Sequence, residues 1–290
     1  MSFEYSEAFS RTVGWITPQE QAVLRRSKVA IAGLGGVGGS HLLTLARLGV
    51  GAFAISDLDV FELANFNRQA GAFMRYVGRP KVEVLRELAL DINPELKIEM
   101  FPRGIGEANV EQFLDGVDVY VDGLDYFAVK ARRLVFERCE RNRIASVTAA
   151  PLGMGAAVLT FLPGRMSFED YFCLDGIPEE DQLVRFLVGL SPSMLQRNYL
   201  VYPAAVNFAK KKGPSTPMAC EICAGMAATQ VLKILLRRGS ILAAPWGLHF
   251  DAFRNRLKRT WRPWGNRNPI QKVAIAIARR VLENARRASI

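Results

Sequence analysis

The stretch VAIAGLGGVGGSHLLTLARLGVGAFAISDLDV, residues 29–60, decides the fold of this chain. Its first apolar run ends in the spaced glycines Gly33, Gly35 and Gly38, and a helix-like segment leads to a second apolar run that ends at Asp57. Glycines at a helix start let the backbone approach a phosphate, and a carboxylate after the second strand can accept hydrogen bonds from a ribose. The stretch is a dinucleotide-binding βαβ fingerprint, and both NAD and ATP fit it.

Segments of the same two kinds alternate on the C-terminal side of this unit. Apolar runs predict strands at 28–33, 52–57, 96–100, 117–122, 145–150 and 155–162, and helical spacing predicts helices at 37–48, 80–92, 110–114 and 127–141. The alternation predicts an α/β, Rossmann-like fold, with a mostly parallel sheet and helices on both of its faces.

The chain of 290 residues is expected to form a single domain with four parts. The pattern weakens after residue 163 and indicates a long crossover excursion before an apolar helix at 219–238, a late strand or hairpin at 249–261 and a basic amphipathic helix at 269–288. The parts are a nucleotide-binding core at 27–162, the excursion at 163–218, the helix and late strand at 219–262, and the basic tail at 263–290.

Composition and charge narrow the class of protein. Half of the residues are apolar, and four are cysteines. The sequence contains no uninterrupted run of eighteen apolar residues, so no transmembrane helix is predicted. The first residues lack a secretory signal pattern, so we expect a cytoplasmic protein. Residues 254–290 hold eleven of the 38 basic side chains and one of the 28 acidic ones, so the whole net charge of +10 lies there. This tail is either a solvated segment or a surface for RNA, an anionic membrane or an acidic partner.

Residues beyond the fingerprint distinguish ATP from NAD. The second strand is followed by Asp57, Asp59, Asn65, Arg68 and Gln69, then by Arg79-Pro80-Lys81, and the strand 117–122 is followed by Asp125. An arginine and a lysine aimed at the glycine loop suit a triphosphate better than a redox dinucleotide. A carboxylate at the end of a strand can help to hold Mg²⁺, which prefers carboxylate, phosphate and water oxygens.

This set of motifs resembles the ThiF/MoeB/HesA superfamily of ubiquitin-activating-like adenylyltransferases. Its glycine loop, Asp-x-Asp, Asn-x-x-Arg-Gln, Pro-Lys and Asp-x-x-Asp motifs occur here in order at Gly33–Gly38, Asp57/Asp59, Asn65–Gln69, Pro80-Lys81 and Asp122/Asp125. The resemblance implies a homodimer that uses ATP and Mg²⁺ to convert a carboxylate into an acyl-adenylate and pyrophosphate. The implied acceptor is a ubiquitin-like or sulfur-carrier protein, a peptide or a small biosynthetic acid.

The resemblance also implies a role for each motif residue. The phosphates pass along Gly33, Gly35, Gly36 and Gly38, and Asp57 takes the ribose. The side chains implied to act on the phosphates are Asn65, Arg68 and Lys81, and Asp125 is implied to bind Mg²⁺. Asp59 and Gln69 complete the implied nucleotide site.

Two features depart from the family pattern. Arg11 matches the first of two N-terminal arginines, but Gly14 stands where the family has the arginine that reaches a neighbouring subunit, so Arg11 is a candidate substitute. One Cys-x-x-Cys pair is present, Cys220 and Cys223, and a zinc site would combine it with Cys173 and a further ligand. Cys220 or Cys223 is alternatively a thioester or persulfide cysteine, because a helix N-terminus favours the thiolate.

Other functions compete with carboxylate adenylation. One branch that this sequence resembles, the tRNA threonylcarbamoyladenosine dehydratases, acts on RNA, which would suit Trp261 and Trp264 among the arginines of the tail. A nucleotide-binding protein without catalysis, which docks partners or an anionic membrane through its last helix, is a reading of another class. An NAD-dependent oxidoreductase is disfavoured by Arg68, Lys81 and Asp125.

Overall fold

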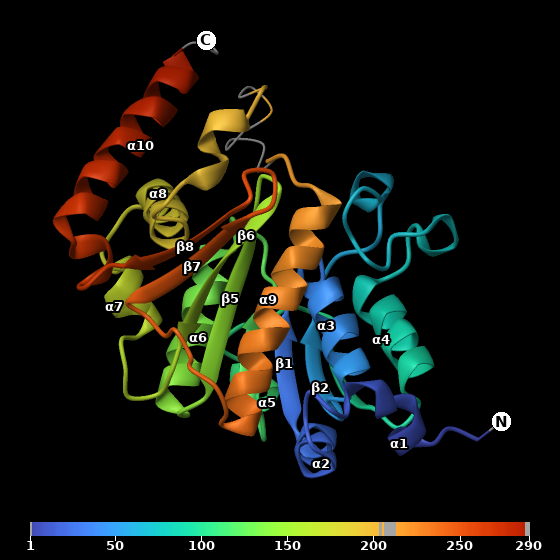
Figure 1. The fold of residues 1–290 in the computed structure, drawn as a ribbon. Helices are drawn as coiled ribbons and strands as arrows, with labels where there is room; N and C mark the ends of the chain where they lie inside the picture. The colour runs from blue at the N-terminus through green and yellow to red at the C-terminus, as the bar shows by residue number, and fades with distance from the viewer. Residues whose placement is uncertain (1, 203–204, 206–212, 288–290) are drawn as a thin grey trace.

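In the computed structural model, one eight-stranded sheet organises the chain (Figure 1). The structure describes residues 2–202, 205 and 213–287, with side chains described as far as residue 281. The strands are β1 (Lys28–Ala32), β2 (Ala52–Ser56), β3 (Lys97–Phe101), β4 (Val119–Asp122), β5 (Ala145–Leu152), β6 (Gly155–Phe161), β7 (Trp246–Asp251) and β8 (Arg256–Trp261). Their order is β3-β2-β1-β4-β5-β6-β7-β8; β1 to β5 pair in parallel and β6 to β8 continue the sheet antiparallel.

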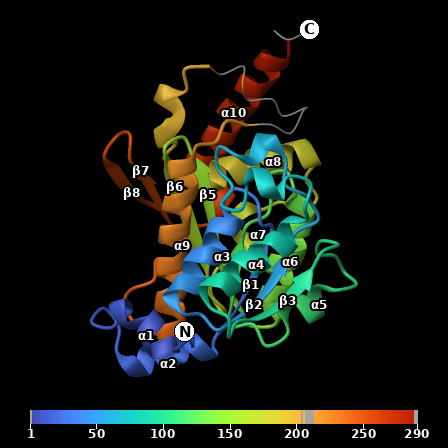
Figure 2. The same cartoon turned by 90° about the vertical axis from the view of Figure 1, so that its right-hand side faces the viewer.

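Helices cover both faces of the sheet, as the alternation predicts (Figures 1 and 2). One face carries α3 (Gly38–Leu48), α4 (Lys81–Ile92) and α9 (Pro217–Leu236). The other carries α5 (Val110–Leu114), α6 (Val129–Arg141), α7 (Phe168–Phe172) and α8 (Glu179–Leu190). The remaining helices are α1 (Tyr5–Ala8), α2 (Pro18–Arg26) and α10 (Pro269–Arg287), with short 3-10 turns η1 (Ser10–Thr12), η2 (Leu63–Asn65), η3 (Met74–Tyr76), η4 (Leu195–Tyr199) and η6 (Gly265–Arg267).

The excursion at 163–218 contains the helices α7 and α8, which the sequence pattern did not predict. Its aromatic side chains pack together under the sheet: Phe168 stacks on Phe136 of α6 at 4.3 Å between ring centroids, and Phe172 lies 5.0 Å from Phe186. Ser167 begins α7 by accepting a hydrogen bond from the Asp170 backbone N–H, a capping box that the sequence displays. The segment is therefore held in place by the burial of these large aromatic rings, and its helices do not depend on a regular helical pattern of apolar residues.

Helix α9 is long and apolar enough to cross a membrane by length and composition alone. In this fold it packs against β5, β6 and α3, and its inward face is part of the main core. Its composition is therefore that of a core helix, because both its partners and its own inward side chains are apolar.

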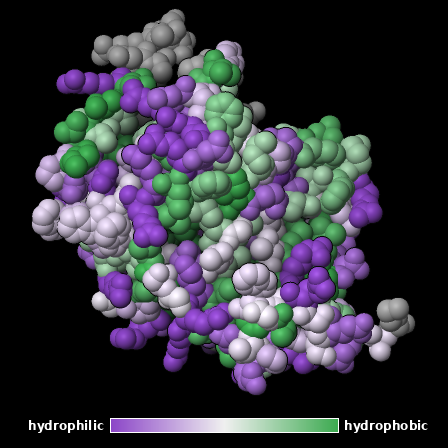
Figure 3. All heavy atoms as spheres, viewed as in Figure 1, coloured by the Kyte–Doolittle hydropathy of each residue, from purple (hydrophilic) through white to green (hydrophobic). Residues whose placement is uncertain are grey.

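The late segment at 249–261 is a hairpin of β7 and β8, which resolves the alternative that the sequence left open. Helix α10 follows it and packs on α8 through Ile275, which meets Val184 and Val188. An amphipathic helix at 269–288 would be expected to bury the apolar residues spaced by four, Val273, Ile277 and Val281, but all three are exposed. Figure 3 shows hydrophobic and hydrophilic side chains side by side over α10, at the upper left.

Two buried histidines make the stability of the fold sensitive to acid. Burial lowers the pKa of both His41, in α3, and His249, in β7, to about 4. His249 Nδ1 is 3.0 Å from Ser191 Oγ and 2.8 Å from Ser193 Oγ. Because the unfolded chain binds protons near pH 6.5 and the folded chain does not, folding is favoured above that pH and the advantage is lost as the pH falls towards 4.

We therefore expect the free energy of unfolding to fall by about 1 kcal/mol per pH unit for each histidine between pH 6.5 and 5. Urea unfolding of the wild type and of a His249→Asn variant at pH 7, 6 and 5 measures this. The variant should show a shallower slope; equal slopes would exclude His249 as a source.

Candidate functional site

The candidate site lies at the carboxyl ends of β1, β2 and β4, at the upper edge of the sheet in Figure 1. β1 pairs in parallel with β2 on one side and with β4 on the other. The glycine loop after β1, the segment 57–81 after β2 and the turn at 123–128 after β4 therefore meet at one edge. This is where open parallel sheets hold ligands, because the chain connections diverge to opposite faces there.

Three glycines close the loop after β1 by packing backbone on backbone. Gly33 has φ +83°, and a Cβ on Gly38 would lie 1.8 Å from the Gly33 carbonyl oxygen. A Cβ on Gly123, which the sequence analysis did not single out, would lie 2.2 Å from the same oxygen. Gly35 instead faces open space, where a Cβ would meet only Gln69 Nε2, at 3.8 Å. The loop is therefore closed on its inner side and open on its outer side, as a phosphate requires.

The Asp57 carboxylate ties the glycine loop to the end of β2. Its Oδ2 accepts a hydrogen bond from the Leu34 N–H at 2.6 Å, and its Oδ1 accepts one from the Asp59 N–H at 2.8 Å. Burial raises the pKa of Asp57, while these two bonds and the Lys81 charge lower it. Each oxygen keeps a second lone pair that a ribose hydroxyl could use.

Lys81 is held at the site by the folding back of segment 57–81. Phe61 is buried and its backbone N–H donates to the Arg79 carbonyl, while Val60 and Pro80 form a β-bridge. These contacts bring the first residue of α4 beside Asp59. Lys81 is 5% exposed, and its Nζ lies 3.1 Å from Asp59 Oδ2. A nearly buried ammonium is thus fixed at the carboxyl edge of the sheet.

Arg68 lies over the glycine loop. A Cβ on Gly36 would be 3.6 Å from Arg68 Cγ and Cδ, so the arginine stem covers this glycine. Arg68 Nη1 donates to the Ala64 carbonyl at 3.0 Å and to Asn67 Oδ1 at 2.8 Å. These bonds occupy one of the three guanidinium nitrogens, so the group is positioned and can still fork onto a phosphate.

Asn65 and Gln69 are the buried members of the same segment. Asn65 Oδ1 accepts a hydrogen bond from the Glu62 N–H at 3.0 Å, which shapes the turn that carries Arg68. Gln69 is 8% exposed, and its buried Oε1 has no hydrogen-bond partner within the described part of the chain. Buried polar atoms are rarely left unpaired, so this amide beside Gly35 has capacity for a ligand.

The turn after β4 is held by a network of buried side chains that the sequence pattern did not predict. Asp122 is buried, and its Oδ2 accepts from Arg132 Nε at 2.7 Å and from Thr148 Oγ1 at 2.8 Å. Arg132 Nη2 donates to the carbonyls of Leu124, at 2.6 Å, and Asp125, at 3.1 Å. Arg132 therefore positions the backbone of the turn. The only sequence signal was a charged residue on an otherwise apolar face of α6.

The turn exposes the Asp125 carboxylate at the edge of the site. Its Oδ1 accepts a hydrogen bond from the Phe127 N–H at 2.9 Å. The carboxylate is solvent-facing rather than paired in the way that Asp122 is. The two acids of the Asp-x-x-Asp motif thus differ in kind: Asp122 is structural, and Asp125 is available to a ligand.

The two cysteines of α9 lie beneath the site and not at its surface. Cys220 and Cys223 belong to the buried core, and a Cβ on Gly36 would be 3.3 Å from Cys220 Sγ. Burial raises the pKa of Cys220, and it raises that of Cys223 well above the usual range. The expected thiolate at the helix N-terminus is therefore not favoured, because desolvation outweighs the helix dipole here.

The zinc site considered from Cys173, Cys220 and Cys223 is not assembled. Cys173 ends α7 and lies beside Asn266 and Arg267 of η6. The Asn266 amide ties η6 to α7 by donating to the Phe172 carbonyl at 2.8 Å. Within residues 2–202, 205 and 213–287, no group of three His, Cys, Asp or Glu side chains is arranged to hold a metal ion.

Arg11 lies away from the other candidate residues of the same chain. It is exposed in η1, and the neighbouring helices α1 and α2 lie at the lower edge of the sheet in Figure 1. The glycine loop is at the upper edge. Any role for Arg11 at the site would have to be in a second copy of the chain.

Both the sequence and the fold of this chain are similar to those of known proteins. The family model described as "ThiF family" matches residues 9–272. The Haemophilus influenzae tRNA threonylcarbamoyladenosine dehydratase is 32% identical over 150 residues, which are 51% of this chain and 57% of that protein. The Arabidopsis thaliana adenylyltransferase and sulfurtransferase MOCS3 is 33% identical over 134 residues, which are 46% of this chain and 28% of that protein.

The chain thus spans about half the length of the first curated relative and less of the second. Among solved structures, Escherichia coli MccB crystallised with ATP has a TM-score of 0.66 at 20% identity, covering 90% of this chain and 73% of that one. This likeness confirms the α/β fold, with its mostly parallel sheet.

Proposed function

Since this chain belongs to the ThiF family, we propose that it uses Mg-ATP to adenylate a carboxylate, releasing pyrophosphate. The observation that carries the proposal is the pair of cations at the open glycine loop. Lys81 is nearly buried beside Asp59, and Arg68 covers Gly36. Fixed positive charges at this place would stabilise the charge that develops on an α-phosphate under attack. A hydride transfer between dinucleotide and substrate has no use for them.

The residues at the site fit a nucleotide in the following way. The phosphates would lie over Gly35 and Gly36, within reach of Arg68, Lys81 and the Gln69 Nε2 donor, which is the side-chain atom nearest Gly35. Asn65 would act with them, and Asp57 would hold the ribose. No covalent protein intermediate is needed for this half-reaction, which depends on positioning and electrostatics.

The site also fits a magnesium ion that arrives with the nucleotide. Mg²⁺ is usually bound by one or two carboxylates together with phosphate and water oxygens, and Asp125 offers one exposed carboxylate. The bound ion would supply further neutralisation of phosphate charge. The protein's part is the placement of Asp125, which Arg132 secures through the backbone of the turn.

We propose that the acceptor is a ubiquitin-like or sulfur-carrier C-terminus, a peptide or a small acid, and that the enzyme is a cytoplasmic homodimer. The curated relative MOCS3 is named as an adenylyltransferase, which supports the reaction class. Segment 57–81 exposes the apolar side chains Leu58, Leu63, Phe73 and Met74 beside the site. Several exposed apolar side chains within one segment are typical of interfaces, so a second copy or the acceptor is proposed to cover them.

A tRNA acceptor is the alternative that a specific observation favours. The Haemophilus relative is named for a modified tRNA base, and β8 exposes Arg256, Lys258 and Arg259 on the edge of the sheet. Trp261 and Trp264 are exposed beside them. A filter-binding titration with tRNA at several salt concentrations tests this reading. An affinity that does not fall with salt would exclude phosphate contacts by this face.

Thermal unfolding with Mg-ATP, and separately with NAD and NADH, tests the proposed nucleotide. We expect Mg-ATP at about 100 times its Kd to stabilise the fold by about 2.7 kcal/mol, and the redox dinucleotides to have no comparable effect. An Arg68→Ala variant should lose the effect of Mg-ATP, and pyrophosphate release then identifies the acceptor. Stabilisation by NAD alone would contradict the proposed function.

A further inference from the structure

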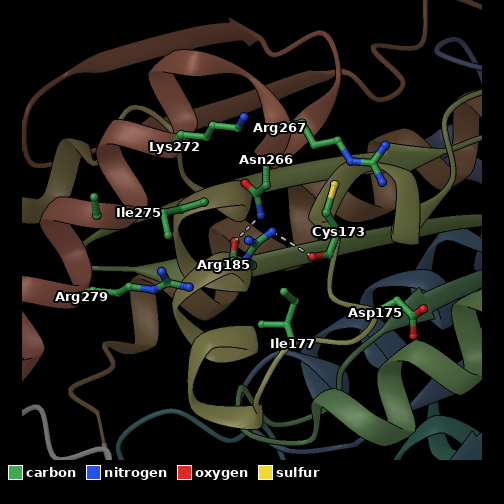
Figure 4. A pocket seen from close by; sticks show the side chains of 10 residues that line it. Cys173, Asp175, Ile177, Arg185, Asn266, Arg267, Lys272, Ile275 and Arg279 are labelled. Carbon is green, nitrogen blue, oxygen red and sulfur yellow. Dashed lines mark hydrogen bonds between the residues drawn. The ribbon is translucent and has the colours of Figure 1, made fainter.

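A second charged site lies where α7, α8, η6 and the first turns of α10 meet. There the structure has a pocket of about 410 Å³ whose walls include Arg185, Arg267, Lys272 and Arg279, with Cys173 at one side (Figure 4). None of these residues belongs to the glycine loop, segment 57–81 or the turn after β4. The pocket is therefore separate from the candidate adenylation site.

The positive charge of this pocket is largely unbalanced. Of the four cations, Arg279 has an acidic partner, since its Nε lies 2.6 Å from Asp181 Oδ1. The one carboxylate in the wall, Asp175, is 3.2 Å from Arg133 outside the pocket. Within the described residues, no ion pair is formed by Arg185, Arg267 or Lys272. Like charges that converge without counter-ions repel one another, so an anion between them would be stabilising.

The wall that carries Arg185 is rigid and has an unused donor. Arg185 Nη1 donates to the Cys173 carbonyl at 3.0 Å, and the Arg185 carbonyl accepts from Asn266 Nδ2 at 2.9 Å. Figure 4 shows both bonds spanning the pocket wall. The Nε atom of Arg185 is buried and has no hydrogen-bond partner in the described part of the chain. That atom is closed to solvent, so a ligand oxygen would instead meet the Nη2 group of Arg185, for which the described residues supply no hydrogen-bond partner.

We propose that this pocket binds a phosphate group of a small molecule. Guanidinium groups recognise phosphate by forked hydrogen bonds, and Lys272 would add a point charge from α10. Such a ligand would bridge α8, η6 and α10. Helix α10 is held to α8 by a small cluster around Ile275, by the Arg279–Asp181 pair and by a hydrogen bond from Gln271 Nε2 to the Val188 carbonyl at 3.2 Å, and the ligand would add a further link. Occupancy of the pocket would therefore fasten the basic helix to the body of the protein.

Cys173 provides a local reporter of occupancy. It is half-buried at the pocket wall, whereas Cys139, Cys220 and Cys223 are buried. A phosphate in the pocket should slow alkylation of Cys173 by iodoacetamide, measured by peptide mass spectrometry on the full chain. Potassium chloride at matched ionic strength is the reference, and inorganic phosphate and glucose 6-phosphate are the probes. Vesicles with and without phosphatidic acid show whether the phosphate can be that of a lipid headgroup.

Arg267→Gln and Lys272→Gln are the test variants, and Arg259→Gln on exposed β8 is the matched control. We expect phosphate to slow alkylation of Cys173 in the wild type and the control, with apparent affinity lower by about tenfold or more in each test variant. A Lys81→Met variant, altered at the nucleotide site, should behave like the wild type. Protection that is absent in the wild type, or lost only in Lys81→Met, would overturn the proposal.

Discussion

Replacing Lys81 by methionine is expected to reduce acyl-adenylate and pyrophosphate formation by about 10² to 10³. Methionine keeps the apolar character of the lysine stem but removes the ammonium, which lies 3.1 Å from Asp59 Oδ2 on a residue that is 5% exposed. A charge held in a place with little water contributes far more to a phosphoryl transition state than a solvated one. Product formation is measured with the acceptor that pyrophosphate release identifies, and nucleotide affinity by calorimetry.

The fold should survive this change, since the partner Asp59 is solvent-exposed and stays hydrated when the lysine is removed. Lys97→Met is the matched control: Lys97 is exposed and begins β3 at the opposite edge of the sheet. It should leave product formation and nucleotide affinity unchanged. If Lys81→Met retains full activity while its stability is also unchanged, the proposed role of Lys81 is wrong.

Replacing Arg132 by leucine is expected to lower the free energy of unfolding by about 3–5 kcal/mol. The change leaves the Asp122 carboxylate buried without its cation, although Thr148 still donates to it. It also removes the donor to the carbonyls of Leu124 and Asp125, so the turn that carries Asp125 loses its anchor. Urea unfolding measures the loss, and calorimetry should show weaker Mg-ATP binding in the protein that remains folded.

The neighbouring Arg133→Leu variant is the control. Arg133 pairs with Glu169 and Asp175 near the surface and should contribute less than about 1 kcal/mol. A double variant with Asp122→Asn should recover part of the stability lost in Arg132→Leu, because it removes the unpaired charge. If Arg132→Leu and Arg133→Leu lower the free energy of unfolding equally, the buried Arg132–Asp122 pair contributes no more than the surface pairs of Arg133, and the prediction is wrong.

Sequence alone predicted the parallel core and the residues gathered at its carboxyl edge. These signals are local: an apolar run predicts a buried strand, a glycine at a fixed spacing predicts a tight loop, and Pro80 marks the start of α4. Once the alternation of strands and helices is accepted, parallel pairing places every strand end on one side. Gly33, Asp57 and Asp125, which directly follow β1 and β2 or lie in the turn after β4, are therefore brought together, however far apart they stand in the chain.

Some features of the protein depend on contacts between residues that are distant in the sequence, and only the tertiary structure shows them. Asp122 and Asp125 look alike in the motif. Only the fold shows that Asp122 is buried in an ion pair with Arg132, whereas Asp125 is exposed to solvent. Helix α7 formed without a periodic pattern because Phe136 and Phe161, on other elements, supply rings against which Phe168 packs.

The burial of the cysteines and the distance between them also depend on the tertiary structure. A thiol at a helix start has an ordinary dipole advantage, yet Cys220 is buried beneath the glycine loop, where desolvation is the larger effect. Cys173 was separated from it because the chain brings η6, not α9, beside α7. The local sequence shows which chemical groups are present and which secondary structure they favour. Burial and ion pairing depend on residues that only folding brings together, so they can be read only from the tertiary structure.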